Sequence, residues 1–190
     1  MTTDTNENVF VKDGVLVIKP TLQDKKFIEN NYTIDLRGQG CTGQQWTDCV
    51  ATTNTTNSTF INPVKSGRIN TKLGASIRFG RVEVVAKLPA GDWLWPAIFM
   101  LPKDNVYGSW PRSGEIDIMS SRGNNVSYAQ GGTNIASSAL HFGPDPGING
   151  WWRNIVKRKA MHTTYASGYN TFGVEARTTF HLHYRMRANS

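Results

Sequence analysis

The sequence has 190 residues, of which 38% are apolar and 18% are charged, with 18 glycines and 8 prolines. This length is typical of one domain that buries its own core, and no run of ~20 apolar residues predicts a membrane-spanning helix. The net charge of +7 does not indicate nucleic-acid binding. Most of the excess lies beyond Arg153, where Glu175 is the only acid, and no basic face interleaved with aromatic residues accompanies it.

Short strands separated by turns are predicted from the amino terminus onward. Residues 9–20 predict two strands joined at Asp13-Gly14, because this dipeptide is a strong hairpin signal. Residues 21–63 are polar and irregular, which is typical of a binding loop or a lid. The first eight residues are polar and contain no signal-peptide core.

Further strands are predicted in the second half of the chain. Residues 81–87 alternate between core-type and polar side chains, which is the pattern of a half-buried strand. Short apolar runs predict strands at residues 97–101, 116–119 and 137–142, and only residues 154–162 have a helical pattern. Strands spaced at ~8–12 residues with glycine and proline turns predict an all-β sandwich or barrel.

Cys41 and Cys49 flank a short Gly/Gln/Thr-rich stretch, which predicts a disulfide that closes a surface loop. The alternative is a pair of free thiols in a cytosolic protein. Glycosylation sequons support an oxidising, extracellular location, with the signal peptide absent from this sequence. The sequons begin at Asn31, Asn54, Asn57 and Asn125.

Two acids lie in one apolar run, where Glu115 and Asp117 alternate with Ile116 and Ile118. Residues two apart in a strand share a face, so both carboxylates point to one side. Carboxylates in such a run need a solvated cleft or a partner. A solvated edge strand without chemistry is the alternative interpretation.

Tryptophans cluster in the sequence around this acidic strand. Aromatic faces stack on sugar rings while acids and amides bind sugar hydroxyls, so the cluster predicts a carbohydrate cleft. His141 is a further candidate for a sugar contact. The alternatives are core packing for each tryptophan and a structural turn for the histidine. The clustered tryptophans are Trp93, Trp95, Trp110, Trp151 and Trp152.

The run from Ser113 to Asn124, Ser-Gly-Glu-Ile-Asp-Ile-Met-Ser-Ser-Arg-Gly-Asn, resembles the active-site strand of glycoside hydrolase family 16, the laminarinase-like endo-β-1,3-glucanases. The resemblance extends over about residues 9–175 and is strongest to fungal members. Further matching runs are Phe-Gly-Arg-Val-Glu at 79–83, Leu-Pro-Ala-Gly-Asp-Trp-Leu-Trp-Pro-Ala at 88–97 and Tyr-Asn-Thr-Phe-Gly-Val-Glu at 169–175.

This resemblance implies a two-sheet antiparallel jelly roll, like that of concanavalin A, with a concave carbohydrate cleft. It implies Glu115 as the nucleophile of a retaining mechanism and Asp117 as its electrostatic helper. Arg122 and Asn124 are expected to contact substrate with Trp93, Trp95, Trp110 and His141. The expected ligand is β-1,3-glucan or mixed-linkage β-glucan. We expect a monomer without a cofactor or metal, and nothing indicates a structural Ca²⁺ ion.

One residue departs from the family pattern, because the acid/base glutamate falls at Ser120. Strict alternation would turn residue 120 away from Glu115, so we expect a bulge at Met119 that returns it to the cleft face. A hydroxyl cannot protonate a glycosidic oxygen. Loss of the acid/base carboxyl group is expected to lower the rate of hydrolysis by ~10²–10⁴-fold. The predictions are therefore an impaired endo-β-1,3(4)-glucanase or, alternatively, a non-catalytic, lectin-like β-glucan-recognition protein.

The ends of the chain also depart from the family. Residues 1–176 are expected to form the sandwich, and residues 177–190 form a basic segment without a counterpart in the family. We expect the sandwich to be incomplete at both ends, with unpaired sheet edges.

Overall fold

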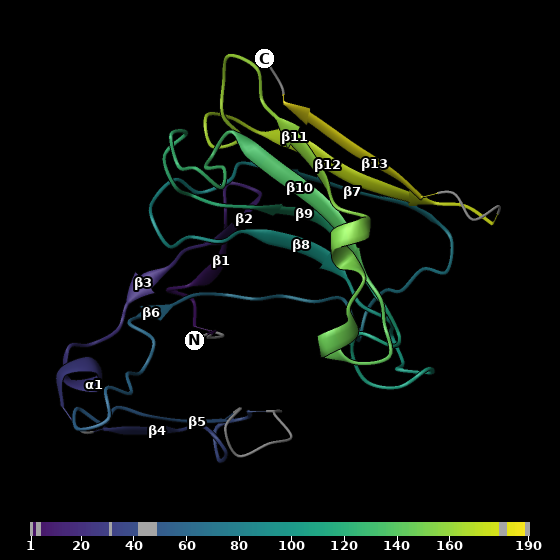
Figure 1. Ribbon diagram of the computed structural model, residues 1–190. Helices are drawn as coiled ribbons and strands as arrows, with labels where there is room; N and C mark the ends of the chain where they lie inside the picture. Colours follow the sequence, from purple (N-terminus) through teal and green to yellow (C-terminus); the bar gives the residue numbers. More distant parts are fainter. Residues whose placement is uncertain (1, 3–4, 31, 42–48, 179–181, 189–190) are drawn as a thin grey trace. The chain divides into compact units, whose positions relative to one another are not determined.

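The computed structural model describes residues 2, 5–30, 32–41, 49–178 and 182–188 (Figure 1). The chain divides into two compact units, an N-terminal unit of Met1–Thr71 and a C-terminal unit of Lys72–Ser190. No helix in the described part of the chain has the length and apolar character needed to cross a membrane.

The N-terminal unit consists of two-stranded antiparallel sheets and one short helix. The hairpin predicted at Asp13-Gly14 is confirmed, because both residues have left-handed backbone angles, with φ of 52° and 76°. Aspartate and glycine tolerate this conformation and so form the tight turn. The elements are β1 (Val9–Lys12), β2 (Val15–Ile18), β3 (Thr21–Leu22), α1 (Lys26–Glu29), β4 (Thr33–Asp35), β5 (Val50–Thr52) and β6 (Val64–Lys65).

The prediction that residues 21–63 are irregular was wrong. Four elements lie in this stretch, and β3 pairs with β6 while β4 pairs with β5. Strands of two or three residues are too short to produce a recognisable alternation, and their pairing partners are distant in the sequence.

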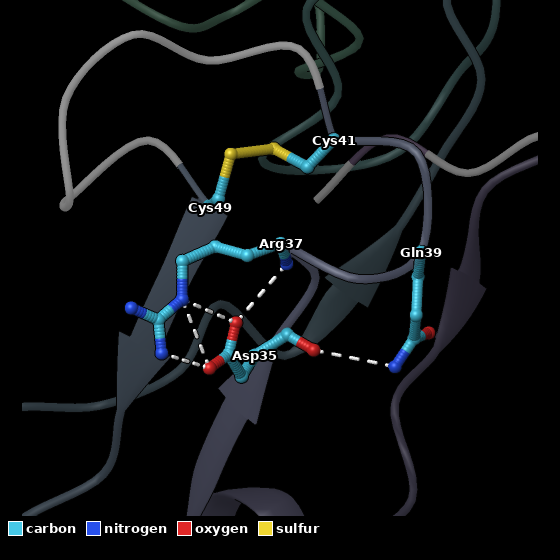
Figure 2. The surroundings of a disulfide bond; sticks show 5 residues. All are labelled: Asp35, Arg37, Gln39, Cys41 and Cys49. Atoms are coloured by element: carbon cyan, nitrogen blue, oxygen red, sulfur yellow. Dashed lines mark hydrogen bonds and ion pairs between the residues drawn. A yellow bond between two sulfur atoms is a disulfide. The ribbon is translucent and has the colours of Figure 1, made fainter.

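The predicted disulfide is confirmed, with the Cys41 and Cys49 Cα atoms 5.8 Å apart (Figure 2). The turn that leads to Cys41 is held by Asp35, whose carboxylate accepts a hydrogen bond from the Arg37 backbone N–H at 3.0 Å and pairs with the Arg37 guanidinium. These hydrogen bonds lower the pKa of Asp35 to about 2. The Gln39 side chain donates to the Asp35 carbonyl at 3.2 Å, so residues 35–39 form a hydrogen-bonded turn.

The C-terminal unit contains two antiparallel sheets (Figure 1). One has the strand order β11-β10-β9-β8 and the other β13-β12-β7. Two short 3₁₀ helices follow β10. The elements are β7 (Gly80–Ala86), β8 (Ala97–Met100), β9 (Glu115–Ser121), β10 (Ile135–His141), η1 (Pro146–Ile148), η2 (Trp151–Arg153), β11 (Val156–Lys159), β12 (Asn170–Ala176) and β13 (Leu182–Ala188).

The core of this unit lies between the two sheets. Ile118 and Met119 of β9 pack in one buried cluster with Phe172 and Val174 of β12. The predicted alternation in β7 is confirmed, since Val82, Val84 and Ala86 are half-buried between exposed neighbours, and Val82 and Ala86 pack against this cluster. Burying each such side chain stabilises the fold by about 1.5–3 kcal/mol. The predicted two-sheet antiparallel sandwich is therefore confirmed.

Two segments of this unit differ from the sequence-based expectation. The helical pattern predicted at residues 154–162 was wrong, because β11 lies there as an exposed edge strand of four residues. β13 lies within residues 177–190, the segment set apart as an atypical basic tail. It pairs along the whole length of β12 and forms one edge of the three-stranded sheet. The domain boundary at residue 176 stays a prediction.

Candidate active site

The acidic strand β9 carries a bulge that determines which side chains share a face. On β8, Phe99 pairs with Asp117 and Ala97 pairs with Ser120. On β10, Ala139 and Ser137 are the corresponding partners. The partners are two residues apart on each neighbouring strand and so share one face, whereas Asp117 and Ser120 are three apart. One extra residue therefore lies between them, and the predicted bulge is confirmed.

Core packing explains why the strand bulges at this point. Ile118 and Met119 are both 1% exposed, so two consecutive side chains enter the core where regular alternation would bury only one. The Ser138 hydroxyl donates to the Ile118 carbonyl at 2.7 Å and satisfies this buried backbone group. The bulge leaves Glu115, Asp117 and Ser120 on the opposite, partly solvated face. We call this surface the acidic face.

Glu115 and Asp117 are neighbouring carboxyl groups on the acidic face. Trp110 Nε1 donates a hydrogen bond to Glu115 Oε2 at 2.7 Å, and His141 Nε2 lies 3.0 Å from Asp117 Oδ2. Burial raises the pKa of Glu115, and the neighbouring Asp117 raises it further, while Trp110 and His141 oppose the shift. Glu115 therefore keeps its proton to a higher pH than an isolated glutamate does.

A hydrogen-bond chain fixes the orientation of His141. The Asn149 amide nitrogen lies 2.9 Å from His141 Nδ1, and the Asn149 amide oxygen accepts from the Trp151 backbone N–H at 3.1 Å. With the Asn149 amide donating to Nδ1, the imidazole proton resides on Nε2 and is donated to Asp117. The Trp151 ring stacks on the imidazole with centroids 6.2 Å apart. The histidine is therefore held in one tautomer, facing the acid pair.

The raised pKa of Glu115 predicts a pH-dependent stability difference in the Glu115→Gln variant. The folded-state pKa lies above the ordinary value of a glutamate, so the contribution of Glu115 to stability is full below that ordinary value and is lost as the pH rises through the folded pKa. We expect the variant to have a larger free energy of unfolding than the wild type at pH 7, because its amide can donate to Asp117 without carrying a charge.

The difference should shrink at pH 4, where most of the carboxyl groups are protonated in both folded and unfolded chains. Urea unfolding followed by tryptophan fluorescence measures both values. Asp104→Asn, in an exposed loop, is the matched control and should show no such pH-dependent gain. A wild type that is more stable than Glu115→Gln at pH 7 would contradict the assignment.

A second cluster lies beside Ser120. Trp95 Nε1 donates to the Ser120 hydroxyl at 2.8 Å, and Trp95 also lines a cavity of about 490 Å³ with Trp93, Arg122 and Asn124. The Arg122 guanidinium donates to the Gln130 carbonyl, and the Asn124 amide donates to the Asp92 carboxylate. Trp95 thus joins this cavity to the acidic face.

Trp93 has an unusual backbone and an unusual exposure. Its φ is 69°, in the left-handed region, and its side chain is 95% exposed. A bulky residue in this conformation lowers the stability of the fold by about 1–2 kcal/mol. Because the indole is exposed, burial of its apolar surface does not compensate for this cost. Gly123 permits the supporting loop to pack closely, because a Cβ there would lie 2.4 Å from the Gly91 carbonyl oxygen. The fold therefore presents Trp93 to solvent beside the cavity.

The structure brings together all the residues predicted for the site, in two groups on one unit. Glu115, Asp117, Trp110 and His141 form the first, and Trp93, Trp95, Arg122 and Asn124 surround the second beside Ser120. Sequence reasoning missed Asn149, for which no local motif gives a signal. Glu115, Asp117 and His141 offer ligand atoms within 4.8 Å of one another and are the described residues that could hold a metal ion.

Comparisons with known proteins agree with this architecture. The chain is 39% identical over 172 residues to a beta-1,3-glucan-binding protein of Penaeus monodon, covering 86% of this chain and 44% of that protein. It is 36% identical over 178 residues to glucan endo-1,3-beta-glucosidase A1 of Niallia circulans, covering 90% of this chain and 20% of that protein. The chain thus spans less than half the length of these curated relatives. No family model matches the sequence.

A solved structure shares the arrangement of strands. The laminarinase catalytic domain from Thermotoga maritima, in complex with cetyltrimethylammonium bromide, superposes with a TM-score of 0.64 at 22% identity, over 97% of this chain and 57% of that one. The chain has a laminarinase-like fold. The laminarinase-like jelly roll predicted from the sequence is therefore confirmed, and its homologues include β-1,3-glucan-binding proteins and glucanases.

Proposed function

We propose that this chain is a member of glycoside hydrolase family 16 that binds β-1,3-glucan, or mixed-linkage β-glucan, across its acidic face. The observation that carries the proposal is the Glu115–Asp117 pair, held by Trp110 and His141 and flanked by a tryptophan-lined cavity. Indole faces pack on the C–H faces of pyranose rings, and the carboxylates and amides bind hydroxyl groups. The names of the two curated relatives support this ligand class.

The proposed chemistry is retaining hydrolysis with an impaired acid/base step. Glu115 is the proposed nucleophile, and its hydrogen bond from Trp110 leaves Oε1 for attack on the anomeric carbon. Asp117, oriented by His141, stabilises the charge that develops on the sugar. Ser120 stands where the acid/base carboxyl is expected, and its hydroxyl cannot supply the proton that the leaving oxygen needs.

A second candidate function is glucan recognition without catalysis. It is favoured by the same hydroxyl at residue 120 and by the name of the Penaeus monodon relative. Under this proposal the acidic face contributes only affinity. The two candidates agree on the ligand and differ in whether Glu115 forms a covalent bond to the sugar.

The ligand class is tested by the affinity of the protein for laminarin. We expect saturable binding to laminarin by titration calorimetry, and a preference for β-1,3-linked chains on a glycan array. Trp93→Ala is expected to weaken laminarin binding about 10-fold, since stacking of one exposed aromatic ring contributes roughly 1–1.5 kcal/mol.

Trp152→Ala is the matched control, because Trp152 is also exposed but lies against Arg153. It should bind laminarin as the wild type does. An absence of laminarin binding, or equal affinities for the wild type and Trp93→Ala, would count against the proposed cleft.

We propose an extracellular, oxidising location for the protein, supported by the disulfide and by the exposed Asn57 sequon. The monomeric state stays a prediction, as does the similarity to fungal members, since the relatives named above come from an animal and a bacterium.

A further inference from the structure

A second cavity lies at the β11 edge of the four-stranded sheet and contains a pair of lysines. Its volume is about 290 Å³. Its walls come from the segment 126–135, which follows β9, and from β11. The side chains on which the inference depends are Lys157, Lys159, Tyr128 and Ile135.

Strand register places both lysines on the acidic face. Lys157 pairs with Ser137 and Lys159 pairs with Ile135, and Ser137 in turn pairs with Ser120. Directly paired residues point to the same side of a sheet, so the lysines share the side of Ser120. Neighbouring strands are ~4.8 Å apart, which puts the Lys157 and Ser120 backbones about 10 Å from each other. One oligosaccharide can span this distance.

Tyr128 links this cavity to the tryptophan-lined one, because it contributes to the walls of both. The two cavities are therefore neighbours along one surface. A chain that stacks on Trp93 and Trp95 can continue past Tyr128 toward β11 without leaving the protein.

The lining of the lysine cavity is unsuited to a neutral sugar. Lys157 and Lys159 are exposed, no acidic side chain lines the cavity, and neither lysine has an ion-pair partner within 4.0 Å among the residues that the structure describes. Two like charges two residues apart on one face repel each other, and an anion between them removes that repulsion.

The remaining walls match the body of a sugar ring. Tyr128 and Ile135 supply apolar surface for a C–H face.

From this combination of unpaired charges and apolar surface at the end of the acidic face, we propose that the lysine cavity binds an anionic sugar residue of the polysaccharide that crosses this face. The chemistry recognised is a carboxylate or sulfate carried on a pyranose ring. The inference rests on the proposed glucan function and narrows its ligand to chains that carry negative charge at this end of the cleft.

The test compares three probes by titration calorimetry: laminarin, laminarin oxidised to carboxylates at its primary hydroxyls, and sulfated laminarin. At least one charged probe is expected to bind about 5-fold tighter than laminarin, and this advantage should fall between about 0.05 and 0.5 M NaCl because salt screens exposed charges. The carboxylate and sulfate arms tell which anion is preferred.

The double variant Lys157→Gln/Lys159→Gln should lose the advantage of the charged probe. The matched control is Arg158→Gln/Lys103→Gln, which removes two charges as well. Arg158 alternates with the two lysines on β11 and so belongs to the opposite face, and Lys103 lies outside both cavities. The control should keep the advantage in full.

Several results would overturn the inference. If laminarin binds and neither charged probe binds tighter, the anionic site is wrong while the glucan cleft stands. If the Arg158→Gln/Lys103→Gln control also loses the tighter binding of the charged probe, that tighter binding is an effect of net charge and not of the lysine cavity. A single-stranded oligonucleotide that binds as tightly as the charged glucans would make the cavity a general polyanion site. If none of the glucans binds, the proposed function fails together with the inference.

Discussion

Ser120→Glu is expected to raise the rate of laminarin hydrolysis by about 10²–10⁴-fold, because it returns an acid/base carboxyl to the acidic face. The β9 bulge already directs residue 120 to the side of Glu115 and Asp117. Retaining hydrolysis needs two carboxyl groups about 5–5.5 Å apart, one to attack the anomeric carbon and one to protonate the leaving oxygen.

The surroundings of Ser120 suit a carboxyl group of this kind. Trp95 Nε1 donates to the Ser120 hydroxyl at 2.8 Å and can donate to a carboxylate oxygen in the variant. The negative charges of Glu115 and Asp117 should raise the pKa of the introduced glutamate, which keeps it protonated for the first step. Covalent attachment of the sugar neutralises Glu115, and the introduced group can then act as a base toward water.

Release of reducing ends from laminarin measures the gain, with product stereochemistry followed by NMR. Ser137→Glu is the matched control, because Ser137 pairs with Ser120 on the same face but belongs to the next strand. It should give no comparable gain. If Ser120→Glu binds laminarin and releases no reducing ends, the hydrolase proposal fails and glucan recognition remains.

The acidic face could be predicted from the sequence for local reasons. Alternation in Glu-Ile-Asp-Ile predicts that the two acids share a face, and the family resemblance adds the bulge that brings Ser120 to it. The turn at Asp13-Gly14 could also be predicted from local sequence, since both residues accept the left-handed conformation that the turn requires. Each of these features depends on neighbours a few residues apart.

The features that were missed depend on contacts between distant segments. Asn149 reaches His141 because η1 turns the chain back, with the Asp145 carboxylate accepting from the Gly147 and Ile148 backbone N–H groups. No motif signals that contact. β11 and β13 are edge strands, and their pairing with β10 and β12 determines their conformation more than their own propensity does. Trp93 combines a left-handed φ with an exposed side chain, and the preferences of tryptophan predict neither.

An activated aryl glycoside tests the nucleophile in the wild-type chain. A dinitrophenyl β-laminarioligoside has a leaving group that needs no proton, so the absence of an acid at residue 120 does not block the first step. Glu115 attacks the anomeric carbon, the bond to the aryl oxygen breaks, and dinitrophenolate leaves. We expect a burst of about one dinitrophenolate per protein, followed by slow turnover, because Ser120 cannot activate water for the second step.

Three measurements separate this mechanism from background hydrolysis. Mass spectrometry should detect the glycosyl group on the peptide that contains Glu115. Glu115→Gln should lower dinitrophenolate release by more than about 10³-fold, since an amide is a poor nucleophile. Azide attacks the anomeric carbon without needing a base, so it should accelerate turnover and yield a β-glycosyl azide.

Asp117→Asn is an informative comparison, because it keeps the size of the side chain and removes its charge. It should slow the burst without abolishing the covalent adduct, since Asp117 stabilises charge and does not bond to the sugar. A wild-type chain that binds laminarin yet shows neither burst nor adduct would mean that Glu115 serves binding alone. The same acidic face would then belong to a glucan-recognition protein.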